Sequence, residues 1–190
     1  MQKHRGDDLD VKFMRMALGQ AQMAVTKEQT PFGAVVVDKT GRLVGKGHNH
    51  VRSDLDPTAH GEVVAIRNAW RRAGKWQNLT GGTLYTSCEP CLLCSFVIAQ
   101  IGFSRVVFAA RGTDVPTYRP LLGSDFMKAA SWINAQSDWA HIEVVPDFMR
   151  ERAKEILSTF PWSDDYAKKI TKKITRVRTS SSSVGGQKRR

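Results

Sequence analysis

TLYTSCEPCLLCSFVIAQIG, residues 83–102, is the segment on which the fold of this 190-residue chain depends. Its first residues, Thr83–Thr86, are typical of a short β-strand. Pro90-Cys91 then favours the start of a helix, because proline is tolerated in the first helical turn, and Gly102 favours its end. The segment therefore predicts a strand followed closely by a helix, with three cysteines at the junction.

Outward from this segment, strands and helices alternate. Residues 10–27 predict an amphipathic helix, and Gly33–Val37 with Arg42–Asn49 an antiparallel hairpin. A helix from about Ala59 to Ala73 follows, with Thr58 as its N-cap and Trp70 on its apolar face. Beyond residue 102 the pattern predicts a strand at Arg105–Ala109 and then a loop at Ala110–Gly123. A helix at Asp125–Gln136, a strand at Ile142–Val145 and a helix at Phe148–Phe160 follow. This order indicates an α/β sandwich around a mixed sheet.

Composition favours a soluble protein with one buried core. Hydrophobic residues make up 41% of the chain and charged residues 25%, and no apolar run approaches the ~18 residues of a membrane span. The polar N-terminus lacks the apolar region of a secretory signal. We expect a cytoplasmic protein without a membrane partner.

The net charge of +11 is concentrated at the C-terminus. Nine basic and no acidic residues lie in 168–190, which leaves 20 basic and 18 acidic residues in 1–167. We predict a folded domain over residues 1–165 and a basic tail over 166–190. Such a tail either binds nucleic acid electrostatically or is simply solvated.

The cysteines Cys88, Cys91 and Cys94 lie within seven residues, a clustering that indicates metal or redox chemistry rather than a disulfide framework. With His60, thiolates of this cluster form a donor set that suits tetrahedral zinc. Pro90 favours Cys91 and Cys94 as the ligand pair, because it places both cysteines in the helix.

Three protein ligands would leave one coordination position open for an activated water. Glu62, two residues after His60, would then carry protons from water to the substrate. Two other interpretations remain at this stage. Cys88 could be a fourth ligand in a closed structural site, and His60 alone could be a capping or core residue.

The pattern His60-x-Glu62 with Pro90-Cys91-x-x-Cys94 is similar to the signature of zinc nucleobase deaminases, in the cytidine deaminase-like superfamily. The segments PFGA (31–34), DPTAH (56–60) and YTSCEPC (85–91) resemble those of bacterial guanine deaminases. This resemblance implies a three-layer α/β/α sandwich with a five-stranded sheet, one zinc ion per chain, and a homodimer. It also implies that Asn49, Phe32, Ala59 and Asp114 contact the substrate, with Asp114 assisting Glu62 in catalysis.

The resemblance does not extend to the segment after Asp114, VPTYRPLLGSD, or to the C-terminal part of the chain. The sequence favours a small amino-heterocycle as substrate, with guanine first and pterins or amino-triazines as variants. The alternative is adenosine in tRNA, with the basic tail as an anchor.

Overall fold

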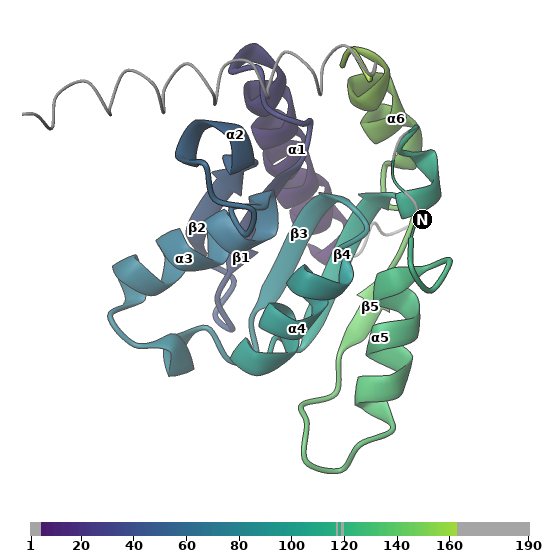
Figure 1. Ribbon diagram of the computed structural model, residues 1–190. Coiled ribbons are helices and arrows are strands. Elements are labelled where there is room, and N and C mark those ends of the chain that lie inside the picture. The colour runs from purple at the N-terminus through teal and green to yellow at the C-terminus, as the bar shows by residue number, and fades with distance from the viewer. Residues whose placement is uncertain (1–4, 117, 119, 163–190) are drawn as a thin grey trace, which may run out of the picture. The chain divides into compact units, whose positions relative to one another are not determined.

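Five strands form one mixed sheet in the order β2-β1-β3-β4-β5 (Figure 1). The strands are β1 (Gly33–Val37), β2 (Leu43–His48), β3 (Thr83–Cys88), β4 (Arg105–Ala110) and β5 (Glu143–Val145). β1 pairs antiparallel with β2 and β3, whereas β3, β4 and β5 run parallel. Every residue of β1 is buried, as expected for a central strand covered on both faces.

Helices cover both faces of the sheet (Figure 1). On one face, α1 (Arg5–Thr26) packs against β1 and β3, and α6 (Arg150–Ser158) against β4. On the other, α3 (Gly61–Ala73) packs against β2 and β1, followed by α4 (Leu92–Ile101) and α5 (Asp125–Asn134). The predicted three-layer α/β/α architecture is confirmed.

The computed structural model describes residues 5–116, 118 and 120–162. Residues Met1–Phe160 group into one compact unit. The predicted domain boundary at residue 165 and the predicted basic tail, 166–190, lie outside the described residues. No helix in the described part of the chain combines the length and apolarity needed to cross a membrane.

The start of α3 differs from the prediction. His60, not Thr58, is the N-cap, because the Thr58 N–H and hydroxyl both bond to Asp56 Oδ1, at 2.8 and 2.6 Å. These bonds hold Thr58 in a local turn that precedes the helix. Trp70, predicted on the apolar face, is 45% exposed.

Smaller differences concern the connections. Cys91 is the N-cap of α4, so Pro90 precedes the helix instead of lying in its first turn. The loop before Pro57 contains the short helix α2 (Val51–Asp54), and two 3-10 turns occur, η1 (Trp76–Asn78) and η2 (Gly112–Asp114).

Candidate active site

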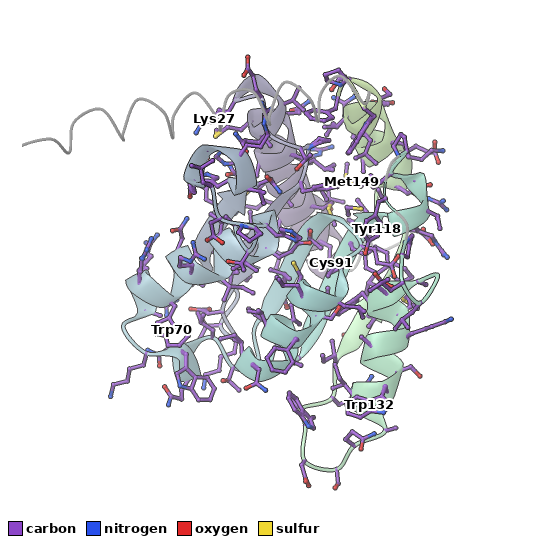
Figure 2. All side chains as sticks on the ribbon, in the orientation of Figure 1. Lys27, Trp70, Cys91, Tyr118, Trp132 and Met149 are labelled. Carbon is purple, nitrogen blue, oxygen red and sulfur yellow. The ribbon has the colours of Figure 1, made fainter. Side chains whose placement is uncertain are left out.

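The starts of two helices bring the predicted metal ligands together. His60 is the N-cap of α3, and Cys94 lies in the first turn of α4. Cys91, labelled in Figure 2, is the N-cap of α4. His60 Nδ1 is 3.4 Å from Cys91 Sγ and 3.5 Å from Cys94 Sγ, and the two sulfurs are 3.8 Å apart. Three donors from two separate segments of the sequence thus face a common point.

These spacings fit a tetrahedral zinc ion. Bond lengths of about 2.3 Å to sulfur and 2.05 Å to nitrogen place two sulfurs about 3.8 Å apart, and a nitrogen and a sulfur about 3.6 Å apart. The observed distances agree with both values. With three protein donors, one tetrahedral position is left for a water or a substrate.

The Cys91 thiol ionises readily in this cluster. Its hydrogen bonds with Cys94 and His60 lower its pKa to about 4. The hydrogen bond with Cys91, in which the thiolate accepts from the imidazole, in turn raises the pKa of His60. Since the thiolate is the form that binds metal, Cys91 is prepared for ligation at neutral pH.

Glu62 lies in the first turn of α3, and its side chain is buried. Burial raises the pKa of its carboxyl group, and the negative Cys91 thiolate adds to the effect. Glu62 Oε1 lies 3.2 Å from the Thr86 hydroxyl, which orients the carboxylate from β3. A buried carboxyl group with a raised pKa is suited to taking up and releasing protons.

Cys88 does not join this cluster. Among the described residues, one group of three or more potential ligands is close enough to hold a metal, and it consists of His60, Cys91 and Cys94. The buried Cys88 thiol instead points toward the Arg111 carbonyl oxygen at 3.7 Å. The geometry therefore favours the open three-ligand site over the closed four-ligand alternative.

Three predicted substrate residues lie just outside the ends of regular elements. Phe32 precedes β1, Asn49 follows β2, and Ala59 lies two positions before α3. The buried Asn49 accepts a hydrogen bond from Val51 N–H through Oδ1 (3.1 Å), and its own N–H bonds to Phe32 O (2.9 Å). The fully buried Ala59 accepts a hydrogen bond from His50 N–H (2.9 Å). Ala59 therefore presents little side-chain surface to a ligand, and its contact with a substrate stays a prediction.

Asp114 is held in an ion pair. Arg150 donates from Nε to Oδ2 (2.8 Å) and from Nη2 to Oδ1 (2.7 Å), and Arg111 N–H adds a bond to Oδ2 (2.8 Å). The hydrogen bonds from Arg150 lower the pKa of Asp114. A carboxylate stabilised in this way is poorly suited to carrying protons, so the geometry favours a positioning role.

Glu89 contacts both ends of the connection between β4 and α5. It is buried, lies two positions before Cys91 in the sequence, and accepts hydrogen bonds from Gly112 N–H (3.2 Å), Ser124 Oγ (2.7 Å) and Met127 N–H (3.4 Å). One carboxylate thus joins the metal-binding segment to both ends of the loop.

Thr86, Glu89 and Arg150 were not among the predicted site residues. Thr86 and Glu89 lie inside the segment quoted first, and alternation along β3 would have placed Thr86 on a definite face. Nothing in the sequence pattern marks Arg150, whose partner lies 36 positions earlier.

Comparisons with known proteins agree with this geometry. Residues 7–110 match the family model described as the cytidine and deoxycytidylate deaminase zinc-binding region. This range includes His60, Glu62, Cys91 and Cys94.

Among relatives, the tRNA-specific adenosine deaminase of Haemophilus influenzae is 32% identical over 169 residues, which are 89% of this chain and 92% of that protein. The Aquifex aeolicus tRNA-specific adenosine deaminase is 40% identical over 98 residues, 52% of this chain and 64% of its own length. The guanine deaminase of Bacillus subtilis is 48% identical over 84 residues, 44% of this chain and 53% of that protein.

A similar solved structure comes from a study of A-to-I editing by tRNA:A34 deaminases at the wobble position. It has a TM-score of 0.64 and 28% identity, and the match covers 77% of this chain and 99% of that chain.

Proposed function

Because the chain belongs to the cytidine and deoxycytidylate deaminase zinc-binding family, we propose that it deaminates adenosine in tRNA. The observation that carries this proposal is the likeness to the Haemophilus influenzae enzyme, which extends over nearly the whole of both chains. The sequence by itself favoured guanine as a free base. The relatives support the tRNA alternative better, because the guanine deaminase match covers a shorter region.

The proposed reaction is hydrolytic. One water adds its oxygen to C6 of adenine, the C6–N6 bond breaks, and inosine and ammonia are released. Zinc, when held by His60, Cys91 and Cys94, supplies a Lewis acid that lowers the pKa of water to about 7.

Glu62 moves the protons. The carboxylate accepts one proton from water and delivers it to N1 of the base. It then accepts the remaining water proton from the hydroxyl on C6 and passes it to N6, which leaves as ammonia. The Thr86 hydroxyl, 3.2 Å from Oε1, orients the carboxylate. Burial excludes bulk water from the transfer and raises the pKa of Glu62, so its affinity for protons lies closer to neutral pH.

Base recognition is assigned to the residues that flank the start of β1 and the end of β2. Since Asn49 Oδ1 accepts from Val51 N–H, the amide NH₂ is the group that would donate to a ring acceptor. Phe32, which follows Pro31 and is joined to Asn49 through its carbonyl, would supply the aromatic wall. Asp114 would hold the loop after β4 in place. We also expect a homodimer, which light scattering would test.

Guanine is the second candidate. The observation in its favour is the 48% identity to the Bacillus subtilis enzyme, the highest of the three relatives compared. In that reaction the water oxygen would add to C2 of guanine, and xanthine and ammonia would be the products.

One assay separates the two candidates. Zinc-loaded protein is incubated with a tRNA anticodon hairpin carrying adenosine at the wobble position, and in parallel with free guanine at equal concentration. We expect inosine in the hairpin and no xanthine, with Glu62→Gln inactive on both substrates. Xanthine formation without inosine would replace the tRNA assignment by the guanine one.

A further inference from the structure

The free edge of the sheet is bordered by a long groove. β2 is the outermost strand at one end of the sheet and lies against α3 (Figure 1). Two adjoining cavities of about 500 and 460 Å³ follow this strand and share Leu43, Val44 and Arg72 as lining residues. They therefore form one groove along β2, which at six residues extends for about 20 Å.

The groove is basic. Lys39, Lys46 and Arg72 line it and are exposed, and in the described part of the chain no ion-pair partner is found for any of them. Asp38 is the one acidic lining residue, and it is neutralised by Arg42 through Nη2 at 3.0 Å. The uncompensated charge is thus positive along the whole groove, which suits a polyanion.

One end of the groove lies beside the candidate active site. His50, a lining residue, directly follows Asn49, and its N–H bonds to Ala59 O (2.9 Å), next to the predicted ligand His60. The other end reaches Lys39 and Thr40 in the turn between β1 and β2. A chain whose base enters the active site could therefore continue along this groove.

The end near the site also offers a ring for stacking. The half-buried His50 packs on the buried His48, with ring centroids 4.3 Å apart. His48 lines the groove as well, and its Nε2 has no hydrogen-bond partner among the described residues. Imidazole rings are among the side chains on which unpaired RNA bases stack. Asn68 also lines the groove, and amide side chains of this kind contact sugar and phosphate in nucleic-acid complexes.

We propose that this β2-edge groove binds the phosphate backbone of the RNA substrate. Lys46 and Arg72 contact phosphates, and His50 stacks on a base next to the nucleotide whose base enters the active site. The proposal rests on the proposed function, because it needs an RNA substrate. It assigns RNA anchoring to the folded domain and does not depend on the C-terminal tail.

The test uses the zinc-loaded full chain and the same anticodon hairpin, labelled for fluorescence anisotropy. The groove variant is Lys46→Glu with Arg72→Glu. The control is Arg71→Glu with Lys75→Glu, which changes the net charge equally, at exposed positions next to the groove lining but not part of it. Unfolding temperature and zinc content verify that both variants fold.

We expect the groove variant to bind the hairpin at least about tenfold more weakly than wild type. The plot of the logarithm of the association constant against the logarithm of the salt concentration has a negative slope. In the groove variant this slope should become shallower by about 1.4, or about 0.7 for each phosphate that the protein no longer neutralises. The control should stay within about twofold of wild type in affinity and keep the wild-type slope.

The possible failures are distinguishable. If wild type deaminates the hairpin but both variants bind it equally, the groove assignment is wrong and the proposed function stands. If wild type neither binds nor deaminates RNA but forms xanthine from guanine, the proposed function is wrong and the groove assignment falls with it. If polyglutamate displaces the hairpin from the groove at equal charge concentration, the groove binds acidic chains in general and the RNA assignment is overturned.

Discussion

Asp114 and Arg150 form a two-point ion pair, with Arg150 Nε 2.8 Å from Oδ2 and Nη2 2.7 Å from Oδ1. Arg111 and Asp147 form a second pair beside it, and Arg150 also lies 3.4 Å from Asp147. These contacts join the loop after β4 to the start of α6. Asp147 and Met149, which flank Phe148, both have positive φ angles, of 61° each. The backbone at this junction is therefore held in a costly conformation.

A double-mutant cycle tests what the pair does. Asp114→Asn and Arg150→Met should each destabilise the fold by about 1 to 2 kcal/mol, with a coupling of about 1 kcal/mol. The control cycle is Arg152→Met with Glu155→Gln, an exposed pair on the same helix, whose coupling should be under about 0.5 kcal/mol. Urea unfolding measures both cycles.

Kinetics then separate positioning from catalysis. If Asp114 positions the loop, both single variants should raise KM and change kcat by less than about tenfold. A catalytic Asp114, as the sequence resemblance implied, would instead show a loss of kcat in Asp114→Asn of about 100-fold or more, with little change in Arg150→Met.

Glu62→Gln should lower kcat by about 10³-fold, because general acid–base catalysis contributes about 10² to 10⁴. Zinc content should remain at one ion per chain, since Glu62 is not in the ligand cluster. Thr86→Val should have a smaller effect, about 3- to 10-fold, since it removes the group that orients the carboxylate. Steady-state rates with metal analysis check this, and a Glu62→Gln enzyme with the wild-type kcat would refute the proton-transfer assignment.

The three cysteines should respond differently to serine substitution. Cys91→Ser and Cys94→Ser should each reduce bound zinc well below one ion per chain, because each removes a thiolate donor. Cys88→Ser should retain the metal, since its thiol faces the Arg111 carbonyl oxygen. Zinc stoichiometry after dialysis decides the matter, and metal loss in Cys88→Ser would restore the four-ligand alternative.

His48 should make stability depend on pH. Burial lowers its pKa from 6.5 to about 4, so between these values the unfolded chain binds a proton that the folded protein does not. Stability should therefore fall as the pH drops from 6.5 toward 4, with a contribution of about 2 kcal/mol between pH 7 and 5. Urea unfolding of wild type and His48→Gln at both pH values measures the difference.

The control for this measurement is His141→Gln, which removes an exposed histidine and should keep the wild-type pH dependence. If His48→Gln loses as much stability as wild type between pH 7 and 5, the buried imidazole is not the source.

The sequence alone determined the fold class and the metal-binding chemistry, because both depend on local patterns. A short apolar run rich in β-branched residues predicted β1 over Gly33–Val37, the bounds that the structure shows. Cys91 and Cys94 are three positions apart at a helix start, so their convergence follows from helical geometry. His60 and Glu62 could be added because their spacing from each other belongs to a known signature.

Only the tertiary structure decided the relationships that join separate elements. The pairing of Asp114 with Arg150, of Glu62 with Thr86, and the basic groove along β2 each depend on how helices pack against the sheet. Charged and polar side chains far apart in sequence carry no periodic signal that predicts their partner. The loop between β4 and α5 belongs to the same class, because Glu89, which precedes it in the sequence, and Arg150, which follows it, both bond to its residues.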